Sequence, residues 1–566
     1  MNNKEKLVQI FNRMADALEF LGEIPFKVQA YRKAARTIEN LDKDISEIED
    51  LRKLPGIGEG IAKKIKEFLE TGKIKKAEEI FSKVPEGILD LMHIPSLGPK
   101  TLALLNKEFG VKDIESLKKA LSNPRLKTLS GMGEKKVENI KKGIELFLSS
   151  KERYLLGEVY PIVKSLIEFL KNHPDTEFVI PAGSFRRFKE TVGDIDILVT
   201  TKKEGNLTHY STEFPKIKRV LVCGPTKSSF ILENGLQVDV RVIPSESMGA
   251  AMQYFTGSKQ HNIHLRRIAR DMGLKISEYG VFKDEKMIAG KTEEELYGVL
   301  KMQWIPPEIR EDEGEIELAL KGEIPLLIDF NDIKGDLHIH SNYSDGQNTI
   351  LEIKEKARER GYEYIAICDH SQSLKYAKGL SIERLLKKKE EIEKLNQKED
   401  LPYIIFGAEV DILPDGSLDY PDEILKQIDY VVASVHTGFK KDNTERILKA
   451  FDNPYVHALS HPTGRLIGSR ESYTADWDKI FKKAAEKEIW MEINAYYERL
   501  DLYPSLIKKA KKYGIKFVIG TDAHHYNQMW MIELGIGTAR RGWLKKDDVI
   551  NTMGLKELLR ILKRRV

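Results

Sequence analysis

Seven short apolar segments alternate with Lys/Glu-rich segments from Lys334 onward, and this alternation constrains the fold more than any other feature. The apolar segments are Asp336–His340, Tyr364–Cys368, Ile404–Glu409, Tyr430–Val435, Val456–Ser460, Ile489–Ile493 and Phe517–Gly520. Apolar strands that alternate with helices form parallel sheets, because each crossover helix covers a face of the sheet. Seven such units predict a closed or nearly closed (β/α)7 barrel.

Nine potential metal ligands stand at or just beyond the ends of these predicted strands, in six of the seven units. They are His338, His340, Asp345, His370, Glu409, His436, His461, Asp522 and His524. In parallel barrels the active site forms at the C-terminal ends of the strands, so we expect these side chains to converge. Imidazoles and carboxylates suit Zn²⁺, Mn²⁺ or Fe²⁺, and nine ligands exceed what one ion uses. Several neighbouring ions indicate phosphoester hydrolysis.

A separate cluster of carboxylates lies upstream. In Gly193-Asp-Ile-Asp-Ile-Leu-Val199, Asp194 and Asp196 are two residues apart on a predicted strand and therefore face one side, while Asp239 lies in a similar strand. Clustered carboxylates repel one another unless divalent cations neutralise them, and oxygen ligands suit a pair of Mg²⁺ ions. The preceding Gly183-Ser-Phe-Arg-Arg187 supplies backbone N–H groups, a hydroxyl and guanidinium groups that suit a triphosphate.

The rest of the chain is organised around these two clusters. Residues 1–150 have helical periodicity, short strands follow between Phe178 and Val242, and helical periodicity returns from Ser247 to about Glu317. Three glycine turns in the first 150 residues predict helix starts that hold DNA phosphates through backbone N–H groups. Their expected DNA-binding residues are Gly56, Gly58, Gly98, Lys100, Gly131 and Gly133.

Composition excludes several classes of protein. The net charge is only +4 over 566 residues, so any nucleic-acid-binding surface must be local. Two cysteines exclude a disulfide framework and fit a reducing compartment. The N-terminal residues predict an amphipathic helix rather than a signal peptide, and no apolar run reaches membrane-spanning length. We therefore expect a cytoplasmic protein without a membrane partner.

The segment Gly183-Ser-Phe-Arg-Arg187 followed by Gly193-Asp-Ile-Asp196 resembles the nucleotidyltransferase signature of the family X DNA polymerases, with a core like that of DNA polymerase beta. The resemblance covers about residues 1–315 and identifies the glycine turns as helix-hairpin-helix motifs. It implies that Asp194 and Asp196 hold two Mg²⁺ ions, and that Asp239 completes one site and takes the proton of the primer 3′-hydroxyl. The residues that it implies for nucleotide binding are Gly183, Ser184, Arg187, Gly193, Tyr254, Phe255, Gly257, Asn262 and Arg266.

Lys64 aligns with the Schiff-base lysine of the family's 5′-deoxyribose-phosphate lyase domain, and Lys27 and Tyr31 also match. Gly60 and Phe26 depart from that pattern, and a lysine in a Lys-rich helix is usually only solvated. A catalytic role of Lys64 is therefore left open.

The C-terminal part resembles the PHP (polymerase and histidinol phosphatase) domain over about residues 334–566, through segments such as Cys368-Asp-His370 and Thr521-Asp-Ala-His524. All nine ligand positions of that family's trinuclear site are filled. The resemblance implies about three Zn²⁺ or Mn²⁺ ions and a 3′–5′ exonuclease, with 3′-phosphatase and abasic-site endonuclease activities left open. Arg465, just past His461, could hold the phosphate, but it is interpreted as a surface arginine.

These features predict a multidomain chain with helical N-terminal domains, an α/β nucleotidyltransferase palm and a C-terminal barrel. The expected boundaries are 1–80 and 81–150 for two helix-hairpin-helix regions, 151–245 for the palm, 246–315 for a nascent-base-pair-binding subdomain, 316–333 for a linker and 334–566 for the PHP domain.

The expected function is that of a bacterial or archaeal DNA polymerase that fills short gaps in base-excision repair. It would act as a monomer on gapped or primed DNA with deoxynucleoside triphosphates, and its PHP domain would trim 3′ ends. A phosphoesterase tethered to DNA by a non-polymerising N-terminal half is one alternative, against which the intact Asp194, Asp196, Asp239 and Arg187 argue. A non-catalytic DNA scaffold is the other, and the filled ligand sets argue against it.

Overall fold

The computed structural model describes residues 3–563 except 40, 42–44, 46–47, 49, 86, 93, 95–96, 130, 134–135, 142, 145–152, 203–205 and 399. Contacts divide the chain into two compact units. The first comprises Met1–Glu152 with Gly468–Glu471, and the second comprises Arg153–Ile467 with Ser472–Val566. Among the described residues, none of the helices combines the length and the apolar character that crossing a bilayer requires.

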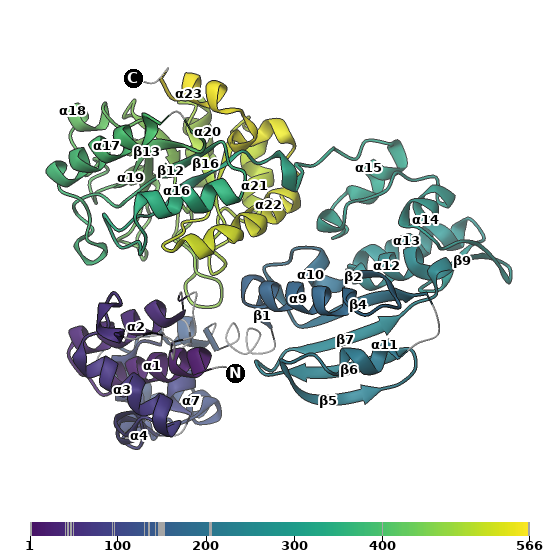
Figure 1. The fold of residues 1–566 in the computed structure, drawn as a ribbon, viewed down its shortest axis with the longest axis horizontal. Coiled ribbons are helices and arrows are strands. Elements are labelled where there is room, and N and C mark those ends of the chain that lie inside the picture. The colour runs from purple at the N-terminus through teal and green to yellow at the C-terminus, as the bar shows by residue number, and fades with distance from the viewer. Residues whose placement is uncertain are drawn as a thin grey trace. The chain divides into compact units, whose positions relative to one another are not determined.

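The first unit is helical (purple to blue in Figure 1). Its helices are α1 (Asn3–Phe20), α2 (Pro25–Glu39), α3 (Glu59–Thr71), α4 (Lys75–Phe81), α5 (Ile88–Leu91), α6 (Pro99–Phe109) and α7 (Ile114–Leu121). Apolar residues at helical spacing, such as Leu7, Phe11 and Met14 in α1, are fully buried in one core. Helical periodicity therefore predicted this part of the fold correctly.

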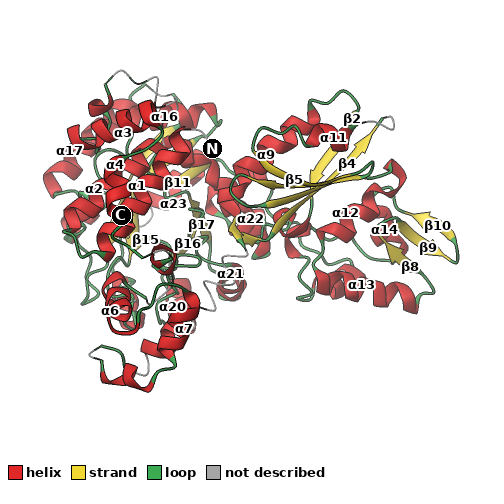
Figure 2. Cartoon of the chain, turned by 90° about the horizontal axis from the view of Figure 1, so that it is seen from below, coloured by secondary structure: helices red, strands yellow, loops and turns green. Residues whose placement is uncertain are grey.

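A five-stranded sheet with the order β2-β4-β7-β6-β5 opens the second unit. Its strands are β2 (Thr176–Pro181), β4 (Asp194–Thr201), β5 (Ile217–Cys223), β6 (Lys227–Leu232) and β7 (Gln237–Val242). Helices α9 (Leu156–Lys171) and α11 (Leu207–Ser211) cover one face and α12 (Met248–Thr256) the other, as Figure 2 shows. A two-stranded pair, β1 (Tyr154–Leu155) and β3 (Thr191–Val192), and the short helix α10 (Gly183–Arg186) flank the sheet.

The next segment departs from the expectation of continuous helix up to Glu317. Helix α13 (Lys259–Asp271) is followed by a three-stranded antiparallel sheet of β8 (Lys275–Ser277), β9 (Gly280–Lys283) and β10 (Lys286–Ala289), and then by α14 (Glu293–Val299). The prediction was wrong here because strands of three or four residues are too short to show a period of two. The segment expected as a linker holds α15 (Glu315–Lys321), and Ile324, Leu327 and Ile328 after it are buried.

The C-terminal part is the predicted barrel, with seven parallel strands in sequence order and helices around them (green to yellow in Figure 1). The strands are β11 (Gly335–Ile339), β12 (Tyr364–Ile367), β13 (Tyr403–Asp411), β14 (Tyr430–Ser434), β15 (Val456–Leu459), β16 (Trp490–Asn494) and β17 (Phe517–Gly520). The helices are α16 (Ile350–Glu359), α17 (Ile382–Asn396), α18 (Asp422–Leu425), α19 (Thr444–Ala450), α20 (Trp477–Glu486), α21 (Pro504–Lys511), α22 (Ile532–Arg541) and α23 (Leu555–Lys563).

The first and last strands of the barrel meet just beyond their C-terminal ends. The Asp522 amide donates to the His338 carbonyl at 2.9 Å, and the His340 amide donates to the Ala523 carbonyl at 2.9 Å. This nearly closes the barrel and brings His338 and His340 beside Asp522, although they are far apart in the sequence. The predicted strands agree with the observed strands to within two residues at each end.

Candidate functional sites

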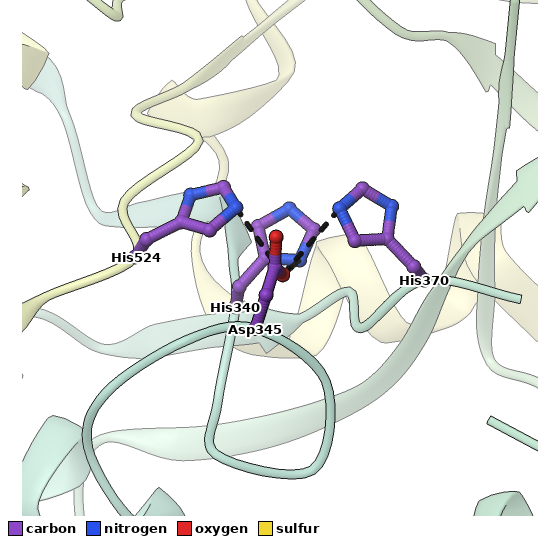
Figure 3. Close-up of side chains that lie close together, drawn as sticks. All are labelled: His340, Asp345, His370 and His524. Atoms are coloured by element: carbon purple, nitrogen blue, oxygen red, sulfur yellow. Dashed lines mark ion pairs between the residues drawn. The ribbon is translucent and has the colours of Figure 1, made fainter. Parts of the chain in front are cut away.

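The predicted ligands of the barrel converge at the C-terminal ends of its strands. His340, Asp345, His370 and His524 form one group, in which the ligand atoms lie within 4.8 Å of one another (Figure 3). Oδ1 of Asp345 lies 3.4 Å from Nε2 of His524 and 3.6 Å from Nε2 of His370. The group joins loops after β11, β12 and β17.

Two further groups share residues with the first. His338, His340 and Asp522 form one, with Nε2 of His340 3.1 Å from Oδ1 of Asp522. His370, Glu409 and His436 form the other, and Nε2 of His461 lies 2.9 Å from the same Glu409 carboxylate. All nine residues proposed from the sequence therefore lie in one continuous cluster.

The donor set fits divalent ions of the Zn²⁺ or Mn²⁺ type. Oδ1 of Asp345 and Oε2 of Glu409 are buried and form no hydrogen bond with any residue that the structure describes, although imidazole nitrogens lie at ion-pair distance from them. A buried carboxylate oxygen without a partner is costly, and a bound cation would remove that cost. Burial and the neighbouring His524 and His370 lower the pKa of His340 to about 4, so its imidazole is neutral, as a metal ligand must be.

A surrounding layer of polar residues was missed by the sequence analysis. Oε1 of Glu492 lies 2.6 Å from Nδ1 of His338, and its other oxygen accepts hydrogen bonds from Ser460 Oγ at 2.8 Å and the His461 amide at 2.6 Å. Asp411 bonds Nδ1 of His436 in the same way. Glu492 lies on β16, the one strand from which no ligand was predicted. A buried glutamate inside the apolar run Trp490-Met-Glu-Ile-Asn494 is the signal that could have found it.

Arg465 was interpreted as a surface arginine, and this was wrong. Its side chain is 13% exposed, and it donates to Glu190 at 2.7 Å and to the carbonyls of Arg499 and Leu500. The contact with Glu190 joins a barrel loop to the segment between the two parts of the nucleotidyltransferase signature.

The upstream carboxylates also come together. Asp194 and Asp196 face one side of β4, whereas Ile195 and Ile197 are fully buried on the other, and Asp239 of β7 is the register partner of Asp196. Burial, and then the charge of Asp194, raise the pKa of Asp196 to about 6. An unfavourable concentration of negative charge of this kind suits divalent cations.

Two cations lie beside this cluster. Nζ of Lys227 is 2.7 Å from Oδ2 of Asp239, and Nη2 of Arg241 is 3.3 Å from the same atom. Nε of Arg241 is also 3.7 Å from Asp196. The protein thus supplies part of the positive charge that the three carboxylates need.

Some of the residues expected to contact a nucleotide lie near the carboxylates, and others contact one another. Asn262 donates to the Tyr254 carbonyl at 2.7 Å, and the Arg266 guanidinium lies 6.0 Å from the Tyr254 ring. Phe255 lies 4.6 Å beneath the Arg241 guanidinium, which in turn contacts Asp239. Gly183 has φ +63, in the left-handed region that favours glycine, and begins α10 beside Asp196. Gly193 lies directly before β4, and Ser184 lies within α10.

Arg187 is held away from bulk solvent by the neighbouring elements. Its Nε donates to Glu311 at 3.1 Å, and its Nη1 donates to the Thr256 carbonyl next to Gly257. Its side chain is 12% exposed. Arg541 of α22 also donates to Glu311, and to the Arg187 carbonyl at 2.8 Å.

In the helical unit, α3 and α6 begin directly after Gly58 and Gly98. Gly56 and Gly131 each have φ +78, which favours glycine. The first-turn N–H groups of such helices can bind a phosphate. The third turn, around Gly131 and Gly133, and the side chain of Lys100 lie partly or wholly outside the described residues.

Lys64 lines a cavity of about 780 Å³ together with Phe26, Lys27, Tyr31 and Gly60. Its Nζ donates to the Gly60 carbonyl at 3.0 Å and lies 5.9 Å from the Tyr31 ring. Burial lowers the pKa of the Lys64 ammonium, which increases the share of neutral amine.

Five family models match the chain. They are a helix-hairpin-helix domain at residues 2–74, a SAM-like helix-hairpin-helix tandem at 88–145, the DNA polymerase beta palm at 157–274, the DNA polymerase beta thumb at 251–311 and the PHP domain at 336–500. Their order agrees with the order of domains expected from the sequence.

A curated relative decides the family. The chain is 39% identical to the DNA polymerase/3′-5′ exonuclease PolX of Bacillus subtilis over 569 residues, which cover 99% of this chain and 100% of that protein. The chain belongs to the PolX family. Other curated proteins match only part of this chain. A probable phosphatase of Thermoanaerobacter pseudethanolicus is 30% identical over 41% of this chain and 96% of its own length. DNA polymerase lambda of Rattus norvegicus is 26% identical over 49% of this chain and 48% of its own length.

Membership in the PolX family confirms the predicted combination of a family X polymerase core with a C-terminal PHP domain. The roles of individual residues remain predictions, as do the finer domain boundaries.

Proposed function

We propose that this PolX-family protein fills short gaps in DNA by nucleotidyl transfer and degrades 3′ ends with its PHP domain. The observation that supports the first activity most strongly is the convergence of Asp194, Asp196 and Asp239 on the adjacent inner strands β4 and β7 of the palm sheet, beside Arg241 and α10. Gapped or primed DNA and deoxynucleoside triphosphates are the proposed substrates. Repair of chromosomal DNA would place the protein in the cytoplasm, where it would act as a monomer.

In the palm, Asp194, Asp196 and Asp239 would hold two Mg²⁺ ions, which when bound activate the attacking hydroxyl and stabilise the charge on the phosphates. Asp239 would accept the proton of the primer 3′-hydroxyl. Arg187, Ser184 and the amides at Gly183 and Gly193 would bind the triphosphate. Tyr254, Phe255, Gly257, Asn262 and Arg266 would border the sugar and the nascent base pair.

In the barrel, the nine-residue cluster would hold Zn²⁺ or Mn²⁺ ions, about three in number. Bound ions of this kind supply a hydroxide and stabilise the leaving oxygen in phosphoester hydrolysis. The protein's own contribution is to orient the imidazoles of His338 and His436 and to set their tautomers, through Glu492 and Asp411. Removal of a 3′-phosphate and cleavage at abasic sites would use the same chemistry.

The helix starts after Gly58 and Gly98 would bind the DNA backbone, with Gly56, Lys100, Gly131 and Gly133 in the same role. Because such contacts recognise phosphates rather than bases, binding would be independent of sequence. The proposed domains keep the boundaries expected from the sequence.

A second candidate is a phosphoesterase for small molecules, tethered to DNA by the N-terminal half. The likeness of the barrel to proteins named probable phosphatases favours it. The intact palm carboxylates favour the polymerase.

Primer extension on a one-nucleotide gap and degradation of a 3′ end separate the candidates. Asp194→Ala should abolish extension and leave degradation, whereas His338→Ala should abolish degradation and leave extension. Loss of both activities in either variant would refute two independent centres, provided that circular dichroism shows both variants folded.

A role of Lys64 as the nucleophile of a 5′-deoxyribose-phosphate lyase is part of the proposal. Its support is the cavity beside Tyr31 and the lowered pKa of the amine. Borohydride should trap wild-type protein, and not Lys64→Ala, on DNA with a 5′-deoxyribose-phosphate end. Lys63→Ala, one residue earlier in the same helix, is the matched control. Equal trapping of Lys64→Ala would exclude this role.

A further inference from the structure

Arg499 lies beside the barrel cluster and belongs to none of the predicted ligand sets. It follows β16, and its Nε is 3.6 Å from Oδ2 of the ligand Asp522. Its side chain is 17% exposed. Its Nη1 is buried and makes no hydrogen bond within the described part of the chain. A buried guanidinium N–H group without a hydrogen-bond acceptor costs free energy, and a bound anion would remove that cost.

The segment that carries Arg499 is tied to the loop that carries His461. The Arg499 carbonyl accepts a hydrogen bond from Arg465 Nε at 2.9 Å. The Asp501 carboxylate accepts from the amides of Thr463 at 2.9 Å and Gly464 at 3.0 Å. Arg499 therefore stands on a fixed backbone between the segments of two ligands, which limits the entropy that it loses when it binds a ligand.

Electrostatics decide what kind of ligand Arg499 can accept. The cluster that it borders is built to bind divalent cations, and these would repel a guanidinium unless an anion lay between them. A phosphate group meets this need, because its oxygens can contact the ions on one side and accept hydrogen bonds from a guanidinium on the other.

We propose that Arg499 is a further catalytic residue of the barrel site, which binds a non-bridging oxygen of the phosphate under attack. The inference rests on the proposed metal-dependent hydrolysis. In that reaction a water oxygen forms a bond to phosphorus, the bond from phosphorus to the 3′-oxygen breaks, and the departing 3′-oxygen takes up a proton. Arg499 transfers no proton, because a guanidinium stays charged, and it stabilises the negative charge that builds up on the phosphate oxygens.

The competing explanation is that Arg499 only neutralises Asp522. The two explanations differ in what the loss of Arg499 changes. A counter-ion for Asp522 would affect the retention of metal and the stability of the barrel. A phosphate-binding residue would affect the affinity for phosphate and the rate of hydrolysis, and leave the metal in place.

The test uses full-length wild type, Arg499→Ala and Arg499→Lys, each purified with Mn²⁺, with Arg358→Ala of α16 as an exposed, ion-paired control. The measurements are the metal content, the inhibition constant of inorganic phosphate, and kcat and KM for 3′-end degradation and for hydrolysis of p-nitrophenyl phosphate. We expect Arg499→Ala to keep its metal, to raise the phosphate inhibition constant about 10- to 100-fold and to lower kcat/KM at least as much. Arg499→Lys should retain part of the hydrolytic activity. Guanidinium added to the solution should restore part of the hydrolytic activity of Arg499→Ala.

An unchanged phosphate inhibition constant, or loss of metal in both Arg499→Ala and Arg499→Lys, would overturn the inference. If Arg499→Ala does not fold, the phosphate inhibition constant of Arg499→Lys tests the inference instead, and an unchanged value would overturn it. The proposed exonuclease can fail separately: wild type that hydrolyses p-nitrophenyl phosphate but does not degrade 3′ ends would refute it, while the phosphate measurement would still test Arg499.

Discussion

Nδ1 of His338 lies 2.6 Å from Oε1 of Glu492, and both side chains are buried although 154 residues separate them. The contact commits Nδ1 to the carboxylate and directs Nε2 toward His340 and Asp522, where it is 3.1 Å and 3.9 Å from their nearest ligand atoms. A carboxylate behind a metal-binding imidazole sets its tautomer and raises its basicity. Glu492 therefore prepares His338 to bind a metal ion.

Glu492→Gln should weaken metal binding by the barrel about 10- to 100-fold, since the loss of such a supporting carboxylate costs this much in metal sites. Titration of chelator-treated protein with Mn²⁺ or Zn²⁺ would measure it. Glu486→Gln, an exposed change on α20, should bind like wild type. Equal affinity in Glu492→Gln and wild type would show that Glu492 only fills space.

Removal of metal should lower the thermal stability of the barrel. The cluster gathers charged and unpartnered groups that bound ions would satisfy, and ligand at 1,000 times its Kd adds ~4 kcal/mol to the free energy of unfolding. Calorimetry with and without a chelator should show a lower Tm for the chelated protein, reversed by Mn²⁺. His340→Ala should show a smaller chelator effect, and an effect as large as that of wild type would contradict the assignment.

Glu293→Gln should destabilise the fold around α14 by about 3–5 kcal/mol, because it leaves buried arginines without their charged partner. Glu293 pairs with Arg310 at 2.7 Å and Arg186 at 2.9 Å, and all three side chains are at most 11% exposed. Urea unfolding would measure the loss, with Glu294→Gln on the exposed side of the same helix as a control expected to change little.

The same network predicts a pH dependence. Burial alone would raise the pKa of Glu293, but Arg310 and Arg186 hold it well below its ordinary value of 4.5. A lowered folded-state pKa gives stability that is fully present above pH 4.5 and is lost as the pH falls below it. The stability difference between wild type and Glu293→Gln should therefore shrink below that pH, and a difference constant down to pH 3 would contradict this assignment.

Lys227→Met should lower the Mg²⁺ concentration needed for half-maximal primer extension about two- to fivefold. Lys227 competes with a cation for Asp239, and a partly exposed ion pair is worth only ~0.2–1 kcal/mol. Lys218→Met, an exposed change on β5, is the control. A higher Mg²⁺ requirement in Lys227→Met would mean that Lys227 assists the metal site instead.

The sequence pattern predicted the secondary structure correctly where the helices and strands were long or strongly apolar. The ends of the seven barrel strands were predicted to within two residues. Apolar strands that alternate with Lys/Glu-rich helices bury their side chains by forming a parallel sheet that the helices cover. The strands β8, β9 and β10 were missed because they have only three or four residues and their turns depend on local conformations such as the positive φ of Asp284. Strands β5 and β6 of the palm were likewise not predicted, although β7, which pairs with β6, was.

What the sequence determined by itself was the identity of the nine barrel side chains and the three palm carboxylates, since ligand chemistry and strand period are local properties of the chain. Only the tertiary structure decided which distant groups support them. Glu492 behind His338, Arg499 beside Asp522 and Lys227 beside Asp239 are contacts between different strands or loops, and nothing in the local sequence around either partner specifies the other. The physical reason is that barrel closure and strand order bring these groups within a few ångströms, and burial then makes their pairing necessary.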